Sequence, residues 1–137
     1  MTYGALYRGL LSGKVTAERA FSGDDLRKID PKFKEPRLGQ YLTAMARLDE
    51  LARERFNQRV LHLAVRWVLD HGGDISLWGG RRPDQMAPVP EIFGRSLDQA
   101  AMDAIDRICR ETIKDPVGPE FMAPPPPEAG LIPIFEV

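Results

Sequence analysis

Hydrophobic positions recur at helical spacing in three stretches of this chain. In the first stretch, apolar residues return every three or four positions with charged residues between them, at Leu38, Tyr41, Leu42, Met45, Leu48 and Leu51. The second stretch repeats the pattern at Leu61, Ala64, Val65 and Val68, and the third at Leu97, Ala101, Ile105 and Ile108. This period is typical of amphipathic helices that bury one face. The sequence therefore predicts three helices.

Local signals set the expected ends of these helices. We expect Asn57 to cap the second helix and the run 71–73 (His-Gly-Gly) to end it, because glycine favours the left-handed conformation at a helix C-terminus. Ser96 and Gln99 have the spacing of a capping box, which predicts the start of the third helix. Pro83 fits the first turn of a further short helix.

Two other segments have different patterns. Residues 74–78 are a candidate for a short strand, and residues 1–8 could supply the end of another. Residues 15–37 show no sustained period and contain Asp30-Pro31 and Glu35-Pro36, which disfavour helix before each proline. There we expect a long surface excursion of the kind that often serves as a lid, with one helical turn near residues 22–26.

Length and composition limit the domain organisation. A chain of 137 residues is long enough for one modest domain and too short for two. We place this domain at residues 1–116 and a proline-rich tail at residues 117–137. Proline removes backbone donors and favours extended chain, so the run Pro124 to Pro127 predicts a flexible, unpacked tail.

Charge and cysteine content exclude several function classes. A net charge of −1 gives no overall field that would attract nucleic acid or an acidic membrane, so we expect neither partner. No apolar run approaches the roughly 20 residues needed to cross a bilayer, and we find no signal peptide. Cys109 cannot form an internal disulfide and lies in the third helical stretch, where a packing role is expected. These features predict a cytoplasmic protein.

Two glycine-rich segments have the chemistry of phosphate-binding loops. Loop 1 is residues 3–14 (Tyr-Gly-Ala-Leu-Tyr-Arg-Gly-Leu-Leu-Ser-Gly-Lys), and loop 2 is residues 77–85 (Leu-Trp-Gly-Gly-Arg-Arg-Pro-Asp-Gln). Glycines let backbone N–H groups approach a ligand, and cationic side chains neutralise phosphate. One such loop is usually only a turn, and an arginine pair is usually a solvated one. Two loops in this order, with a helix between them, favour a nucleotide site.

Both loops and the helical run Leu61–Asp70 resemble the C-terminal part of aldo-keto reductases. The resemblance covers residues 1–116 and implies an α/β fold, namely the C-terminal fragment of a (β/α)8 TIM barrel. As an isolated chain it would be helix-dominated, with one or two short strands. Enzymes of that family reduce carbonyl groups with NADPH. The sequence then reads like the end of a larger protein.

The resemblance implies cofactor-binding roles for nine residues. Tyr3 matches the aromatic residue that stacks on the nicotinamide ring. The adenosine 2′-phosphate and adenine are held by loop 2 through Gly79, Arg81 and Gln85, and Arg82 can supply the same fork of N–H donors as Arg81. The pyrophosphate is covered by Leu6, Ser12, Gly13 and Lys14. We expect NADP(H) as the cofactor if a complete barrel is formed.

The resemblance does not extend to the catalytic residues. Family catalysis uses an Asp, a Tyr, a Lys and a His from the first half of the barrel, and no matching set is present here. We therefore assign no catalytic residue and no metal ligand. His62 and His71 are expected to have structural roles within the second helix and at its end. Pro88 and Val89 stand where the family often has a Glu-Asn pair that contacts adenine.

These observations predict the NADP(H)-binding C-terminal part of an aldo-keto reductase, inactive on its own. Its partner would be the missing barrel half or a second copy, because the apolar helix faces lack most of the sheet that would cover them. Two other functions are consistent with the sequence. One is a noncatalytic interaction module that uses those helix faces, and the other is a nonfunctional truncated remnant.

Overall fold

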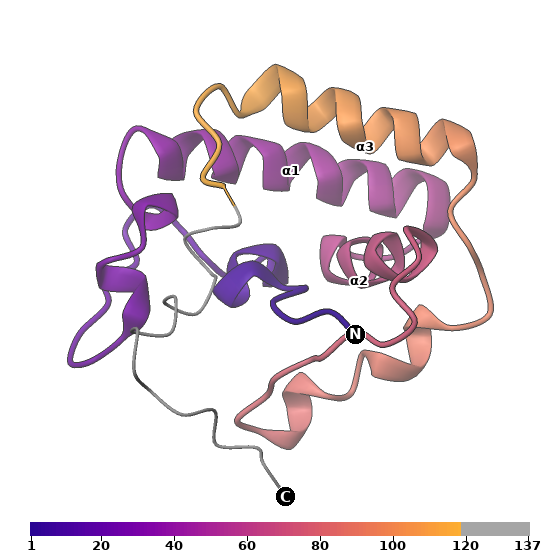
Figure 1. The fold of residues 1–137 in the computed structure, drawn as a ribbon, viewed down its shortest axis with the longest axis horizontal. Helices are drawn as coiled ribbons and strands as arrows, with labels where there is room; N and C mark the ends of the chain where they lie inside the picture. Colours follow the sequence, from indigo (N-terminus) through magenta and orange to yellow (C-terminus); the bar gives the residue numbers. More distant parts are fainter. Residues whose placement is uncertain (119–137) are drawn as a thin grey trace, which may run out of the picture.

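The computed structural model describes residues 1–118, and helices dominate this part of the chain (Figure 1). The α-helices are α1 (Arg37–Phe56), α2 (Val60–Asp70) and α3 (Gln99–Thr112), which confirms the three predicted helices. Short 3-10 helices connect them: η1 (Tyr7–Ser12), η2 (Leu26–Lys28), η3 (Pro31–Phe33), η4 (Pro83–Gln85) and η5 (Val89–Ile92). Pro83 begins η4, as predicted.

The three α-helices pack on one another around α1. In Figure 1, α3 runs antiparallel alongside α1, and α2 lies against α1 and is seen almost along its axis. Their apolar faces meet in one core cluster that includes Leu38, Met45, Leu48, Leu63, Ile105 and Ile108. Burying each such side chain contributes roughly 1.5–3 kcal/mol, so this cluster stabilises the packing of the three helices.

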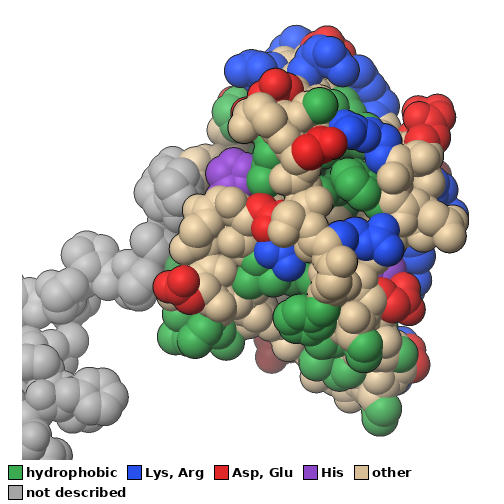
Figure 2. Space-filling model, turned by 90° about the vertical axis from the view of Figure 1, so that its right-hand side faces the viewer, with side chains coloured by type: hydrophobic (Ala, Val, Ile, Leu, Met, Phe, Trp, Pro, Cys, Tyr) green, Lys and Arg blue, Asp and Glu red, His purple; other side chains and the backbone are tan. Residues whose placement is uncertain are grey.

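The helix faces that we expected to lack cover are mostly buried. Met45 and Leu48 are each 7% exposed, and Leu61 and Val65 are each 4% exposed. The expectation of open apolar stripes is wrong for these residues because the helices cover one another. Figure 2 shows one face, on which Lys and Arg side chains gather at the top and hydrophobic side chains form patches in the lower half.

The predicted short strands are absent from the described residues. Within residues 1–118, pairing between extended segments is limited to one parallel bridge between Thr2 and Ser76. The N–H of Thr2 donates to the carbonyl of Ile75 at 2.7 Å, and the N–H of Leu77 donates to the carbonyl of Thr2 at 2.9 Å. A strand needs a continuous ladder of backbone hydrogen bonds with a neighbouring segment, and one isolated bridge does not form such a ladder. The fold of the described residues is therefore helix-dominated.

The start of α2 differs from the prediction. Asn57 ends α1 in the left-handed region, with φ 50° and ψ 41°, and does not cap α2. Asparagine tolerates this conformation better than most residues. Arg59 occupies the N-cap position of α2. The carboxylate of Asp49 in α1 accepts the N–H of Val60, the first residue of α2, at 2.9 Å. The cap of α2 is therefore supplied from another helix.

The other helix ends follow local chemistry. Asp98 caps α3 by accepting the N–H of Ala101 at 2.8 Å, so the predicted Ser96 cap is wrong by two residues. The predicted glycine stop of α2 is confirmed. A Cβ at Gly73 would lie 2.7 Å from the carbonyl oxygen of Val68, so only glycine fits the close approach that ends this helix.

Residues 15–37 are only partly a surface excursion. Their predicted helical turn lies slightly later, at η2, where Asp25 accepts the N–H of Arg27. The following part is buried: Asp30 and Lys32 are both 0% exposed, and Phe33 is 8% exposed. The surface expectation is therefore wrong for residues 30–33.

The residues after α3 return to α1. The side-chain oxygen of Gln40 accepts the N–H groups of Lys114 and Asp115, and the hydroxyl of Tyr41 accepts the N–H of Val117 at 3.1 Å. Of the predicted tail at residues 117–137, residues 119–137 lie outside the described residues. Within residues 1–118 we find no helix with the length and apolar character needed to span a bilayer.

Candidate cofactor site

Loop 1 and loop 2 begin side by side. The Thr2–Ser76 bridge is parallel, so the two segments leave it in the same direction. In a parallel sheet, ligand-binding loops follow the carboxyl ends of adjacent strands. The bridge therefore gives the two loops the relative placement that a shared ligand would need.

The first half of loop 1 contains one exposed and one packed candidate. Tyr3 is 61% exposed, so much of its ring is open to contact with another molecule. Leu6 is half-buried and packs against the small cluster of Ala5, Val65 and Ile92. In this structure Leu6 also anchors the backbone, because its carbonyl accepts the N–H of Gly9 at 2.8 Å.

The middle of loop 1 is held in an unusual backbone conformation by residues 30–32. Tyr7 and Arg8 have φ values of 51° and 55°, which cost side-chain-bearing residues energy. The guanidinium of Arg8 lies 3.3 Å from the carboxylate of Asp30, which also pairs with the ammonium of Lys32 at 3.0 Å. That ammonium lies 4.4 Å from the centre of the Tyr7 ring. This buried cluster fixes the loop.

The Tyr7 hydroxyl is held inside the same cluster. The centre of the Tyr7 ring lies 5.8 Å from the centre of the Tyr41 ring. Burial raises the pKa of Tyr7 well above its ordinary value, and the hydrogen bond with Tyr41 and the negative charge of Asp30 add to this increase. Tyr7 therefore stays protonated and serves as a packing and hydrogen-bonding group.

The end of loop 1 forms a compact turn. The hydroxyl of Ser12 donates to the carbonyl of Gly9 at 2.6 Å and accepts the N–H of Lys14 at 3.3 Å. Gly13 has φ 72°, a conformation that favours glycine. The predicted site residues Ser12, Gly13 and Lys14 are thus brought together, and the Ser12 side chain stabilises the turn.

Loop 2 is held by the side chain of Gln85. Its Oε1 atom accepts the N–H of Arg81 at 2.7 Å and that of Arg82 at 3.1 Å. The guanidinium of Arg82 forms an ion pair with Asp84 at 2.9 Å, with both groups exposed. Gln85 therefore shapes the loop, and both arginine side chains lie at the surface.

Charges from three segments act on one another at this surface. The hydrogen bond from Arg82 lowers the pKa of Asp84, and the positive charge of Lys14 in loop 1 lowers it further. Hydrogen bonds from Arg27 lower the pKa of Asp25 well below its usual range, and the charge of Arg81 contributes to that decrease. Loop 1, loop 2 and residues 25–27 thus share one charged region.

Of the two glycines in loop 2, Gly79 leaves room for a ligand. No atom lies within 4 Å of a Cβ built on Gly79, whereas one on Gly80 would lie 2.9 Å from the sulfur of Met86. The open space at Gly79, the exposed Tyr3 ring and the cationic Lys14, Arg81 and Arg82 are compatible with a phosphorylated nucleotide that has an aromatic ring. The residues present fit the predicted cofactor.

The two histidines contact neighbouring residues of α2. His62 is 3% exposed, and its Nδ1 atom accepts the N–H of Arg59 at 3.2 Å. Burial lowers the pKa of His62, although the nearby carboxylate of Glu91 opposes this effect. His71 packs its ring against Trp67 at 3.9 Å between centres. Within residues 1–118, no three His, Cys, Asp or Glu side chains gather as a metal site requires.

An apolar groove of about 750 Å³ adjoins the bridge. It is lined by side chains from the N-terminus, α2 and α3, among them Met1, Tyr3, Leu63, Trp67, Ile105 and Cys109. Burial raises the pKa of the Cys109 thiol, which keeps it a neutral apolar group.

Sequence reasoning missed several residues that support this site. Asp30 and Lys32 brace loop 1, Asp84 pairs with Arg82, and Asp25 shares the charged region. The only local signal for the first pair was Asp30 before Pro31, which favours a turn. Their burial depends on contacts with residues more than 20 positions away in sequence.

Comparison with known proteins identifies relatives of this architecture. The model of the aldo/keto reductase family matches residues 1–110. Aldo-keto reductase YhdN of Bacillus subtilis is 54% identical over 126 residues, which are 91% of this chain and 38% of that protein. The solved glycerol dehydrogenase AKR11B4 of Gluconobacter oxydans superimposes with a TM-score of 0.78 at 46% identity, over 88% of this chain and 37% of that one. The chain thus spans less than two fifths of the length of either relative.

Proposed function

Because this chain belongs to the aldo/keto reductase family, we propose that loop 1 and loop 2 together hold the NADP(H) of a complete barrel. The observation that carries this proposal is the parallel Thr2–Ser76 bridge, from which loop 1 and loop 2 leave side by side in the same direction. Family members generally use NAD(P)H. When bound, this cofactor supplies a hydride for carbonyl reduction.

Each loop would contact a different part of the cofactor. Tyr3 would stack on the nicotinamide ring, and the turn of Leu6, Ser12, Gly13 and Lys14 would cover the pyrophosphate. The adenosine end would lie on loop 2, with Arg81 and Arg82 donating to the 2′-phosphate. Gln85 would hold the two arginine amides in place, as it does in this structure. Gly79 would provide the open approach.

The rest of the barrel would pack into the apolar groove beside the bridge. The relatives have more than half of their length outside the matched region, and the groove is lined by Thr2, which pairs with Ser76 in the bridge, and by the adjacent Tyr3. Sheet residues of the remaining barrel are apolar on the side that faces the helices. The proton donor for carbonyl reduction would come from that part.

The same groove supports one alternative, a noncatalytic interaction module. In that case the groove would bind a second copy of this chain, and the loops would hold no cofactor. Sedimentation velocity at several concentrations separates the alternatives. A dimer whose loops bind no nucleotide supports the module, and binding of NADPH by a monomer contradicts it.

A chimera tests the proposed function directly. The part of YhdN outside the match would be joined to residues 1–137, and NADPH oxidation would be followed with reactive aldehydes. We expect turnover that depends on NADPH and falls when Arg81 and Arg82 are both changed to alanine. The matched control changes Arg47 and Arg107, which lie on α1 and α3, to alanine.

A binding measurement covers the case in which the chimera does not fold. NADPH or 2′,5′-ADP would be titrated into the chain itself, with amide shifts of loop 1 and loop 2 as the readout. Shifts confined to these loops support the proposal. A folded, active chimera that is indifferent to the arginines, or shifts elsewhere in the chain, would overturn it.

A further inference from the structure

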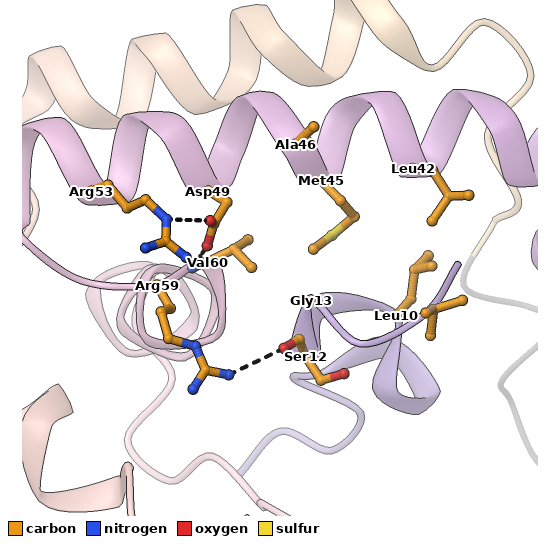
Figure 3. A pocket seen from close by; sticks show the side chains of 11 residues that line it. Leu10, Ser12, Gly13, Leu42, Met45, Ala46, Asp49, Arg53, Arg59 and Val60 are labelled. Atoms are coloured by element: carbon orange, nitrogen blue, oxygen red, sulfur yellow. Dashed lines mark hydrogen bonds and ion pairs between the residues drawn. The ribbon is translucent and has the colours of Figure 1, made fainter. Parts of the chain in front are cut away.

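A second cavity lies between loop 1 and α1, apart from the apolar groove. Its volume is about 250 Å³, smaller than the roughly 300–1,000 Å³ that drug-sized ligands occupy. Figure 3 shows that α1 contributes one wall and the end of loop 1 contributes the other, with Arg59 and Val60 closing one side. Neither Tyr3 nor any residue of loop 2 lines it.

The two ends of this cavity differ in chemistry. One end is apolar, formed by Leu10 from η1 and by Leu42 and Met45 from α1. The other end holds three charged side chains: Asp49, Arg53 and Arg59 (Figure 3). An occupant must therefore combine a short apolar part with a polar or charged head.

The charged end carries an excess of positive charge. Asp49 remains ionised: burial raises its pKa, but hydrogen bonds from Val60 and Arg53 and the charges of Arg53 and Arg59 outweigh this, so the pKa is lowered overall. One carboxylate then faces two guanidinium groups. A monoanionic head would neutralise the remaining charge.

Arg59 has hydrogen-bonding capacity left for such a head. Within residues 1–118 its guanidinium makes one hydrogen bond, from Nη2 to the carbonyl of Ser12 at 3.4 Å, which is long. A guanidinium has five N–H donors in a fork that suits a carboxylate. The Nε–H of Arg53 donates to the carboxylate of Asp49 at 2.6 Å, and the Arg53 side chain is exposed.

We propose that this cavity binds a small carboxylate with a short unbranched apolar chain. Its carboxylate accepts hydrogen bonds from Arg59 and Arg53, and its chain lies against Leu10, Leu42 and Met45. A neutral or cationic head of the same size would leave the positive charge unbalanced. No group transfer is involved, since the site only binds.

Binding there restrains the end of loop 1. Ser12 and Gly13 line this cavity and also form the turn that we assign to the pyrophosphate. A bound carboxylate that accepts hydrogen bonds from Arg59 would hold its guanidinium beside the Ser12 carbonyl, so it would reduce the mobility of residues 12–14. This regulatory consequence rests on the proposed function, whereas the binding itself does not.

Titration with hexanoate tests the site without any cofactor. Amide and methyl shifts would be followed by NMR, with hexan-1-ol and hexylamine as head-group controls. We expect saturable hexanoate binding, with shifts at Leu10, Leu42 and Met45, and at least about tenfold weaker binding when Arg59 is changed to methionine. Arg53→Met should weaken binding, and Arg47→Met, on α1 but paired with Glu111, should not.

A length series provides a second, independent arm. Leu42→Ala enlarges the apolar end, so octanoate should gain affinity relative to hexanoate. Circular dichroism confirms that each variant is folded. No saturable binding, equal binding of hexylamine, an unchanged affinity in Arg59→Met, or shifts centred on Trp67 in the apolar groove would each overturn the proposal. Because no nucleotide is present, these outcomes are independent of whether NADPH binds.

Discussion

Loop 1 and loop 2 begin at the same bridge but are held in different ways. Loop 1 is fixed by distant, buried partners, because Arg8 contacts Asp30, and Leu10 is only 2% exposed in the main core. Loop 2 is fixed by its own residues, through the Gln85 side chain and the Arg82–Asp84 pair at the surface. Both carry glycines and cations, so composition alone did not separate them.

The difference shows which part of the site this chain can build alone. A loop braced by buried ion pairs keeps its conformation without a ligand, because breaking such a pair leaves an uncompensated charge. A loop held by exposed pairs gains little from them, since water screens exposed charges. We infer that loop 1 is preorganised, and that loop 2 would become ordered mainly through the phosphate that we propose it binds.

The largest expected effect concerns the chemistry that neither loop supplies. The chain alone should show no carbonyl reductase activity, because no Asp, Tyr, Lys and His set can be assigned and positioned acid–base groups contribute about 10² to 10⁴ in rate. NADPH oxidation with reactive aldehydes measures this. Turnover that disappears when Tyr3 or Tyr41 is mutated, in protein free of host reductase, would show that the prediction is wrong.

The next prediction compares how the two loops are anchored. Asp30→Ala should lower the free energy of unfolding by about 3–5 kcal/mol, because Lys32 then remains buried without its carboxylate. Gln85→Ala should lower it by about 1 kcal/mol or less, the typical contribution of a hydrogen bond. Urea unfolding followed by circular dichroism measures both changes. Similar losses in the two variants would remove the proposed distinction between the loops.

The sequence predicted the elements of this fold better than the contacts between them. The period of Leu38, Met45 and Leu48 predicts α1 because a helix buries one face whatever its partner is. The cap of α2 could not be predicted, since Asp49 accepts the N–H of Val60 from a different helix. Asn57 was misassigned because asparagine favours both an N-cap and the left-handed region at a helix end.

The same limit applies to the candidate site. Glycine and arginine spacing predicted both loops and their order, because those features are local. The Asp30–Lys32 pair and the cavity beside Arg59 depend on tertiary packing. The prediction of short strands is wrong for the opposite reason, because there the local pattern is present and the tertiary partner is missing. Residues 74–78 have a suitable local pattern but too little neighbouring backbone to form a ladder.

A third prediction concerns cofactor choice by loop 2. In a complete barrel, changing Arg81 and Arg82 to alanine should weaken NADPH binding by about ten- to hundredfold and leave NADH nearly unaffected, because only NADPH has the 2′-phosphate. Fluorescence titration of both cofactors measures the ratio. An equal loss for the two would mean that these arginines shape the loop and do not contact the phosphate.

The Arg82–Asp84 pair offers the converse change. Asp84→Asn removes the carboxylate that now occupies the Arg82 guanidinium, so NADPH should bind more tightly while NADH changes little. Asp103→Asn, on α3 and far from loop 2 in sequence, is the matched control for loss of one negative charge. A weaker NADPH complex in Asp84→Asn would indicate that the ion pair preorganises loop 2.

The smallest expected effect lies behind both loops, at His62. Its Nδ1 atom accepts the N–H of Arg59, whose side chain contacts loop 1, and its Nε2 atom lies 3.3 Å from Glu91, which follows loop 2. Burial lowers the pKa of His62 below its ordinary value of 6.5, so the unfolded chain binds a proton more readily than the folded one. The contribution of His62 to the free energy of unfolding should therefore be fully present above pH 6.5 and should fall as the pH drops below it, by at most about 1.4 kcal/mol per pH unit.

Urea unfolding between pH 5 and 7 measures the slope of the free energy of unfolding against pH. His62→Asn keeps an acceptor for Arg59 without titrating and should flatten it, whereas His71→Asn, at an exposed position, should not. A slope unchanged in His62→Asn would mean that another group causes the pH dependence and that His62 does not link the two loops by protonation.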